Sequence, residues 1–151
     1  MQRSDGLPAG DAAASLVARY GLAPHPEGGW FVETWHAGAE VVTANGPRST
    51  ASAILFLLDE DEEAAWHVVV SDELWLWHGP GVLEIHDGGT GQVPTPDPHP
   101  TILSADGALQ HLVPAGRWQR TFARRAPAMS SCIVSPAFSY DDWRLHEARS
   151  S

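Results

Sequence analysis

The sequence predicts an all-β domain, either a sandwich or a barrel, that follows one short helix. Two observations lead to this prediction. From Trp30 onward, short runs rich in Val, Ile, Leu, Trp and Phe alternate with groups of Gly, Pro, Asp and Asn, whereas helical spacing of apolar residues occurs only before residue 21. A chain of 151 residues fits one domain, which can bury roughly 68–70% of the surface of its unfolded chain. We expect this domain to span residues 11–147, with disordered ends at 1–10 and 148–151.

The helix is expected between Asp11 and about Tyr20. Asp11 is a suitable N-cap residue, and Leu16, Val17 and Tyr20 give the segment an apolar side. Gly21 follows at the position where helices often end in a left-handed glycine. The helix therefore has a start signal, an end signal and one face to bury.

The strands are expected wherever apolar and β-branched residues cluster between turn residues. Residues 43–48 and 88–100 are predicted to be turns, and the second segment is too rich in Gly and Pro for a helix or a strand. The expected strands lie near residues 30–36, 50–58, 64–70, 73–78, 82–87, 109–113, 117–122 and 131–135.

The composition excludes several classes of protein. The chain has 9 Lys and Arg against 19 Asp and Glu, a formal net charge of −10, so we expect neither nucleic acid nor an anionic membrane surface as a partner. No apolar run approaches the length of a membrane span, and the first residues lack the apolar stretch of a secretory signal. One cysteine, Cys132, allows no internal disulfide and no Cys-based zinc site, and it is expected in the core. We expect a cytoplasmic protein.

The segment around residues 64–78 contains the sharpest chemical pattern. A Ser-Asp turn signal separates the expected strands 64–70 and 73–78, so the two could form a hairpin. Alternation along the second strand then places Glu73, Trp75 and Trp77 on one face. This face would form an apolar wall that carries one carboxyl group.

His67 lies on the first strand of that hairpin, close enough to face Glu73. In an apolar cavity such a pair is an acid–base arrangement, because burial raises the pKa of the carboxyl group while the imidazole opposes that shift. The alternative is a surface ion pair without a function. His86 lies either on the wet face of an ordinary strand or in the same cavity. Gln119 can donate and accept hydrogen bonds but cannot transfer a proton at neutral pH.

Three segments give the chain a family resemblance: HPEGGWF from His25, WHVVVSDELW from Trp66 and VPAGRWQ from Val113. In these segments the chain resembles the cupin superfamily, and within it a branch of short single-domain proteins of unknown function. The likeness extends from about Leu16 to Trp143. It implies a double-stranded β-helix, or jelly-roll barrel, with one short N-terminal helix, and it implies a homodimer.

The resemblance also allows a comparison with metal-binding cupins, whose ligands are three His and one Glu. His67 matches the first His and Glu73 matches the Glu, but Val69 and Gln119 occupy the two remaining His positions. Because imidazole is the better ligand for transition metals, we expect no metal cofactor. If a divalent transition metal binds weakly, its ligands would be His67, Glu73 and Gln119.

The function that this likeness implies is that of a metal-independent isomerase, epimerase or cyclase acting on a small organic substrate, as in the similar barrels of deoxysugar-nucleotide epimerases. His67 would be the base and Glu73 its orienting partner or acid. Trp75 and Trp77 would stack on a substrate ring. Polar or capping contacts to the ligand are expected from Glu33, Arg48, Ser52, His86, Gln119, Phe138 and Tyr140.

Two other functions remain open. One is a cupin that binds a small ligand without turnover, in which the His67–Glu73 pair only orients the ligand. The other is a metal-dependent dioxygenase or decarboxylase, which would need a transition metal in the purified protein. The motifs do not identify the substrate.

Overall fold

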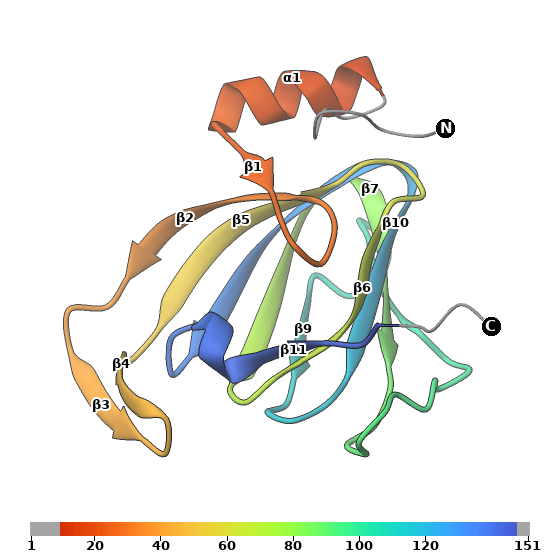
Figure 1. The fold of residues 1–151 in the computed structure, drawn as a ribbon. Helices are drawn as coiled ribbons and strands as arrows, with labels where there is room; N and C mark the ends of the chain where they lie inside the picture. Colours follow the sequence, from red (N-terminus) through yellow and green to blue (C-terminus); the bar gives the residue numbers. More distant parts are fainter. Residues whose placement is uncertain (1–9, 148–151) are drawn as a thin grey trace.

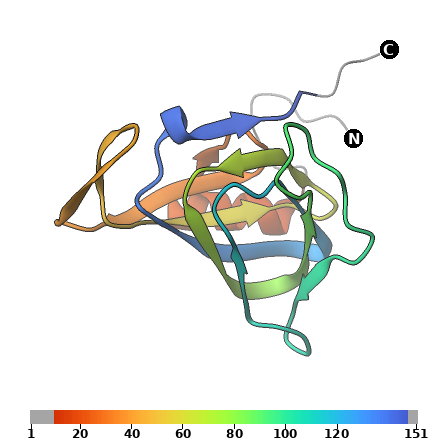
Figure 2. The same ribbon diagram turned by 90° about the horizontal axis from the view of Figure 1, so that it is seen from below.

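Strands make up most of residues 10–147, the part of the chain that this computed structural model describes. Within these residues nine antiparallel strands form one sheet that curls into a half-barrel, and a two-stranded hairpin of β3 (Glu40–Thr43) and β4 (Gly46–Ser49) projects from it (Figures 1 and 2). The all-β class and the double-stranded β-helix predicted above are confirmed. The strands of the sheet are β1 (Ala23–Pro24), β2 (Trp30–His36), β5 (Ser52–Leu58), β6 (Glu63–Val69), β7 (Asp72–Asp87), β8 (Thr101–Leu103), β9 (Gln110–Val113), β10 (Gln119–Ser135) and β11 (Trp143–Leu145).

The two longest strands, β7 and β10, each join two segments that the sequence predicts as separate strands. The two strands pair with each other on both sides of a shared bend, with Arg124 opposite Val82 before it and Ala128 opposite Pro80 after it. Gly81 fits there because a Cβ atom would lie 2.0 Å from the carbonyl oxygen of Ala126. Pairing therefore continues around the bend, and the prediction of separate strands was wrong because a glycine and a bulge bend a strand without ending it.

The predicted hairpin between residues 64–70 and 73–78 does not form. Strand β6 pairs with β10 and β11, whereas β7 pairs with β8, β9 and β10. The short turn between β6 and β7 instead carries the chain from one half of the curled sheet to the other. His67 on β6 and Glu73 on β7 consequently approach each other across the interior, not across a ladder of backbone hydrogen bonds.

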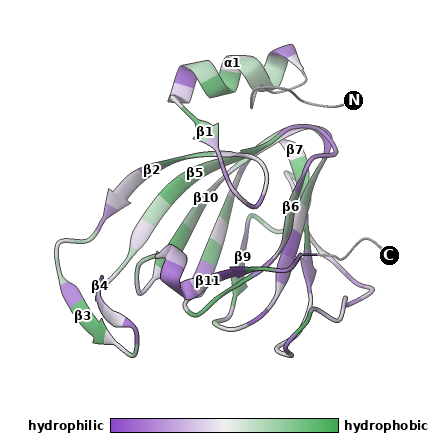
Figure 3. Ribbon diagram, viewed as in Figure 1, coloured by the Kyte–Doolittle hydropathy of each residue, from purple (hydrophilic) through white to green (hydrophobic). Residues whose placement is uncertain are grey.

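Alternation along the strands produces two apolar layers. On β5, Phe56 and Leu58 join the cluster inside the barrel, while Leu57 joins a second cluster on the outer face. Figure 3 shows the apolar residues that follow β5 and β10. The inner cluster, which includes Trp75 and Leu83, fills part of the barrel and leaves the remainder for the cavity described below.

Helix α1 (Asp11–Tyr20) covers the outer layer (Figure 1). Its buried Ala13 packs in the same cluster as Trp30 and Leu57. The predicted end at Gly21 is confirmed, because this residue has φ 66° and its N–H donates to the carbonyl oxygen of Val17. The predicted N-cap was wrong by one residue, because Gly10 is the N-cap and Asp11 is the first helical residue. There the negative charge of Asp11 interacts favourably with the helix dipole.

The remaining elements show where the sequence signals were weak. Residues 88–100 contain no helix or strand, as predicted, whereas residues 43–48 include a turn and most of β4. Strand β8 was not predicted, because it is only three residues long. Of the predicted disordered ends, residues 1–9 and 148–151 lie outside the described part. Among the described residues, no helix has the length and apolarity needed to cross a membrane.

Candidate functional site

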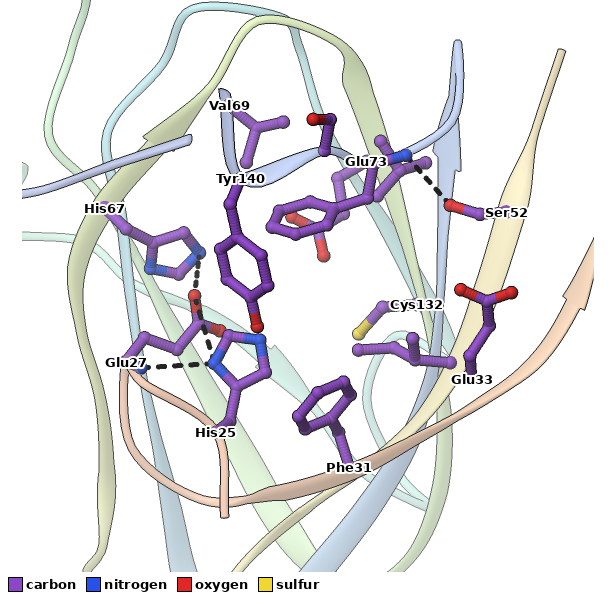
Figure 4. A pocket seen from close by; sticks show the side chains of 14 residues that line it. His25, Glu27, Phe31, Glu33, Ser52, His67, Val69, Glu73, Cys132 and Tyr140 are labelled. Atoms are coloured by element: carbon purple, nitrogen blue, oxygen red, sulfur yellow. Dashed lines mark hydrogen bonds and ion pairs between the residues drawn. The ribbon is translucent and has the colours of Figure 1, made fainter. Parts of the chain in front are cut away.

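A cavity of about 350 Å³ lies inside the curled sheet (Figure 4). The strands β2, β5, β6, β7 and β10 contribute to its wall, together with the segment before β2 and the segment around the 3₁₀ helix η1 (Tyr140–Asp142). Its volume is near the lower end of the usual range for small-molecule sites. The lining residues are His25, Glu27, Phe31, Glu33, Ser52, Ile54, His67, Val69, Glu73, Cys132, Val134, Phe138, Ser139 and Tyr140.

Two glycines place His25 and Glu27 in this wall. Gly28 has φ 111°, and a Cβ atom on it would lie 2.2 Å from the carbonyl oxygen of Glu63 on β6. Gly29 has φ 80°, and its carbonyl oxygen accepts a hydrogen bond from the N–H of His25 at 2.9 Å. Only glycine combines these backbone angles with so close an approach. The HPEGG segment is therefore a tight loop that lies against β6 and directs the Glu27 side chain inward.

The imidazole of His67 has a protein partner at both ring nitrogens. Nδ1 lies 2.7 Å from the carbonyl oxygen of Ala65 and Nε2 lies 3.2 Å from Oε2 of Glu27. Because a carbonyl oxygen only accepts, Nδ1 carries a hydrogen, and Nε2 shares a proton with the carboxyl group of Glu27. Glu27 Oε2 also accepts a hydrogen bond from Nε1 of Trp143 at 3.2 Å. Glu27 and His67 thus form one buried proton-sharing pair.

His25 lies beside this pair without joining its proton exchange. The backbone N–H of Glu27 donates to Nδ1 of His25 at 3.1 Å, so that nitrogen carries no hydrogen. Burial, with a smaller contribution from His67, lowers the pKa of His25 to about 4. His25 is consequently a neutral part of the wall near pH 7.

Glu73 is held by a chain of three side chains. Nε1 of Trp75 donates to Oε1 of Gln119 at 3.0 Å, and Nε2 of Gln119 donates to Oε1 of Glu73 at 2.7 Å. The tryptophan, which can only donate, therefore determines which end of the Gln119 amide faces Glu73. Cys132, on the paired strand β10, lines the same cavity.

Burial dominates the electrostatics of both carboxyl groups. It raises the pKa of Glu27 to about 8, and it raises the pKa of Glu73 to about 7 against the opposing attraction of His67. Burial also lowers the pKa of His67. The side chain of Glu27 is 9% exposed and that of His67 only 2%, so both groups of the pair are largely shielded from solvent. Near neutral pH the cavity therefore holds groups that can both give and accept protons.

Six of the residues proposed from the sequence line the cavity, and five do not. Trp75 and Gln119 are fully buried behind Glu73. Trp77 packs against the inner apolar cluster, and its Nε1 donates to the carbonyl oxygen of Gly81. The six lining residues are Glu33, Ser52, His67, Glu73, Phe138 and Tyr140.

His86 and Arg48 are the remaining two residues outside the cavity. His86 pairs with Glu84 at 2.9 Å and lines a different, smaller pocket of about 160 Å³. Leu83 and Ile85 belong to the inner cluster, so alternation directs the intervening Glu84 and the following His86 to the outer face. Arg48 forms an ion pair with Asp142 at 2.9 Å and thereby holds η1.

Sequence reasoning did not assign a role to His25, Glu27 or the cavity side of Cys132. The signal for the first two was present, because a carboxylic acid followed by two glycines in an apolar surrounding is an unusual pattern. The strand of Cys132 gave no comparable signal, since a cysteine in an apolar strand is normally a core residue.

The residues of the cavity do not fit the metal set of metal-binding cupins. Val69 lines the cavity at one of the expected His positions. The amide oxygen of Gln119, its only ligating atom, accepts from Trp75. In the described part of the chain, no group of three or more His, Cys, Asp or Glu side chains is arranged to hold a metal ion.

A curled antiparallel sheet around a cavity with buried carboxyl and imidazole groups defines a cupin-type barrel. The family model described as cupin superfamily (DUF985) matches residues 14–146, and the chain belongs to this family. A comparison with curated proteins found no match.

Solved structures show the same fold. A hypothetical protein from Leishmania major is 25% identical, with a TM-score of 0.78 over 87% of this chain and 85% of its own. A protein from Shewanella oneidensis is 24% identical, with a TM-score of 0.77 over 97% and 85% of the two chains. KdgF from a Halomonas species is 13% identical, with a TM-score of 0.57 over 80% and 89%. The latter two likenesses show the fold alone.

Proposed function

We propose that this cupin is an enzyme of the isomerase, epimerase or cyclase type that moves a proton within a small organic substrate without a metal ion. One observation carries the proposal: the Glu27–His67 pair and the carboxyl group of Glu73 are buried in different walls of the same cavity. A reaction that removes one proton and returns one needs two such groups. Their raised carboxyl pKa values of about 8 and about 7 suit that task near neutral pH.

In the proposed reaction the carboxylate of Glu73 removes a proton from a carbon next to a substrate carbonyl group. The electron pair of the broken C–H bond moves into the carbonyl group and forms an enolate. The protonated carboxyl group of Glu27 donates its hydrogen to the enolate oxygen. Glu73 then returns its proton to the same or a neighbouring carbon, while an O–H group of the enol gives its proton back to the carboxylate of Glu27, so both carboxyl groups recover their starting states. Atoms and charges balance without a further reactant.

His67 has a different role here from the one that the sequence suggested. Both of its ring nitrogens are engaged, Nδ1 with Ala65 and Nε2 with Glu27. In this proposal His67 therefore acts through Glu27 by positioning its carboxyl group, and Glu73 is the base. Gln119 and Trp75 orient Glu73 from behind.

Hydrogen–deuterium exchange in heavy water tests this proposal. The probes are acetoin, pyruvate and N,N-dimethylaminoacetone, with loss of the α-proton signal followed by NMR. The protein should accelerate exchange in at least one probe, and Glu73→Gln should slow it about 10²–10⁴-fold. Glu60→Gln, which removes one exposed charge outside the cavity, is the matched control and should exchange at the wild-type rate.

Two outcomes would contradict the proposal. If no probe exchanges faster than in buffer, the protein is better described as a non-catalytic ligand-binding cupin. If Glu73→Gln exchanges at the wild-type rate while its melting temperature shows an intact fold, Glu73 is not the base. Elemental analysis of the purified protein tests the metal-free part of the proposal, because stoichiometric transition metal would favour the dioxygenase or decarboxylase alternative.

We further propose that the protein is a homodimer that acts in the cytoplasm. The projecting β3–β4 hairpin exposes Val42, at 84%, and Val41, and Trp35 on the neighbouring strand β2 is 52% exposed. Exposed apolar side chains on a projecting hairpin are suited to pack against a second copy of the chain in a dimer interface. The single free cysteine, Cys132, is buried, which is compatible with a reducing compartment. A monomer mass by light scattering at micromolar concentration would contradict the dimer.

A further inference from the structure

The cavity has no strong cation in its wall. All nine basic residues of the chain are arginines, and no arginine lines the cavity in the described part. The two imidazoles that do line it, His25 and His67, are held neutral by burial. The arginines that form ion pairs do so elsewhere, in Arg48–Asp142, Arg117–Asp87, Arg120–Glu63, Arg124–Asp61 and Arg124–Glu84.

Three carboxyl groups do line the cavity, at different depths. Glu27 and Glu73 are buried in its interior, whereas the side chain of Glu33 is 56% exposed (Figure 4). An anionic ligand would lose its hydration beside these groups and gain no opposite charge, which is strongly unfavourable. The charges of the wall therefore disfavour carboxylate and phosphate ligands.

The aromatic rings of Phe31, Phe138 and Tyr140 line the same space. Phe31 packs edge-on against His25 with ring centroids 4.6 Å apart, and Phe138 packs edge-on against Tyr140 at 4.9 Å. Perpendicular rings of this kind present π-faces in more than one direction. A cation is attracted to such faces, most strongly where water is excluded.

We propose that the cavity binds an organic cation, a ligand with an ammonium group that lies between the carboxyl groups and the aromatic rings. The charge would make a pair with the carboxylate of Glu73 and contact Phe31, Phe138 or Tyr140. A neutral ligand of the same size would leave the ionised form of Glu73 without a partner of opposite charge, so the cation is favoured over it. This inference rests on the proposed function only because both concern the same cavity, and binding of the cation requires no turnover.

The cation would also assist the proposed reaction. A positive charge close to the reacting carbon stabilises the enolate, so it makes the C–H bond easier to break. The substrate class is then a small amino-carbonyl compound. Binding should release protons as well, because a nearby cation favours the ionised form of a carboxyl group. The titratable groups that face the cavity are His25, Glu27, Glu33, His67, Glu73, Cys132 and Tyr140.

Isothermal titration calorimetry on the full chain at pH 7 tests the proposal with three probes of similar size. They are benzyltrimethylammonium, 2-phenylethanol and phenylacetate, which are cationic, neutral and anionic. The cation should bind at least about tenfold more tightly than the neutral probe, and the anion should bind most weakly. In two buffers of different ionisation enthalpy, only the cation should release protons, and these must come from the protein because this quaternary ion carries no N–H.

Matched variants locate the effect. Glu73→Gln should weaken binding of the cation about tenfold and change binding of 2-phenylethanol less than about twofold. Glu60→Gln changes the net charge equally but lies outside the cavity, so it should change neither. The comparison of the three probes on the wild-type protein remains a valid test even if a variant does not fold.

The result that overturns the inference is a cation that binds no more tightly than 2-phenylethanol, or one that binds without releasing protons. That result would leave the proposed proton transfer intact, since acetoin, a neutral compound, could still undergo exchange. Conversely, tight cation binding with no exchange in any carbonyl probe would support the ligand class and contradict the catalytic proposal.

Discussion

Two of the His–Glu pairs among the described residues have almost equal geometry and opposite electrostatics. His67 and Glu27 lie 3.2 Å apart in the cavity, and His86 and Glu84 lie 2.9 Å apart on the outer side of β7. Burial raises the pKa of Glu27 to about 8. The pKa of Glu84 is lowered instead, because His86 hydrogen-bonds to it and Arg124 adds a positive charge. The surroundings, and not the pairing of residue types, decide which pair can exchange protons near neutral pH.

The largest effect is expected from Gly28→Ala, which displaces the loop that carries Glu27. The new Cβ atom would lie 2.2 Å from the carbonyl oxygen of Glu63, at a backbone φ of 111° that alanine rarely adopts. We expect the free energy of unfolding to fall by about 3 kcal/mol or more. Urea denaturation measures this change, and a loss of less than about 1 kcal/mol would mean that the loop adjusts without the glycine.

The next effect concerns the pH dependence of stability. Folding raises the pKa of Glu27 from 4.5 to about 8. The protonated carboxyl group therefore contributes its full stabilisation below pH 4.5, the pKa in the unfolded chain, and this contribution is lost as the pH rises toward 8. His25 and His67 have lowered pKa values and act below about pH 6.5, so the interval from 6.5 to 8 reports mainly on the carboxyl groups.

Between pH 6.5 and 8 the titration of Glu27 should lower the free energy of unfolding of the wild-type protein by about 2 kcal/mol, since each pKa unit corresponds to about 1.4 kcal/mol. We expect Glu27→Gln to lack this decrease. Glu84→Gln on the outer pair should retain the wild-type slope. Equal slopes for all three proteins, from urea denaturation at several pH values, would show that the inner carboxyl group is not raised.

A smaller effect is expected from Gln119→Leu, behind Glu73. The change removes the hydrogen bond to Glu73 and leaves Nε1 of Trp75 buried without an acceptor. We expect a loss of about 1.5 kcal/mol in the free energy of unfolding and a higher pKa for Glu73. A variant as stable as the wild type would indicate that water replaces the amide.

The smallest effect is expected from His86→Gln, on the outer pair. Its side chain is 23% exposed and its partner Glu84 also contacts Arg124, so the free energy of unfolding should change by less than about 0.5 kcal/mol. Proton exchange with the carbonyl probes should be unchanged. Slower exchange in this variant would show that the outer pair also takes part in the chemistry.

The two pairs also show how far the sequence could predict the site. Alternation along β7 correctly placed Glu73 and Trp75 on the inner face, and beyond the bend the inward Leu83 and Ile85 leave His86 on the other face. The partner of His67 could not be found in this way. Glu27 lies in a loop forty residues earlier, and only the tertiary approach of that loop to β6 brings the two together.

The fold was predicted more completely than the pairing of its strands. Strand runs and the glycine at the end of the helix are local signals, and they identified the all-β class and helix α1. The path of the chain from β6 to β7 has no local sequence signal, because the same short turn can close a hairpin or lead to the other half of the curled sheet. The outcome depends on β10, because this long, bent strand pairs with both β6 and β7.

The central claim is that burial gives the cavity carboxyl groups pKa values near neutrality. A ¹³C NMR titration of the glutamate side-chain carboxyl groups tests it directly, with Glu27→Gln, Glu73→Gln and Glu84→Gln used to assign the signals. We expect Glu27 to titrate at about 8 and Glu73 at about 7, with Glu84 below its ordinary value of 4.5. Titration of Glu27 and Glu73 near 4.5, together with Glu84, would contradict the account.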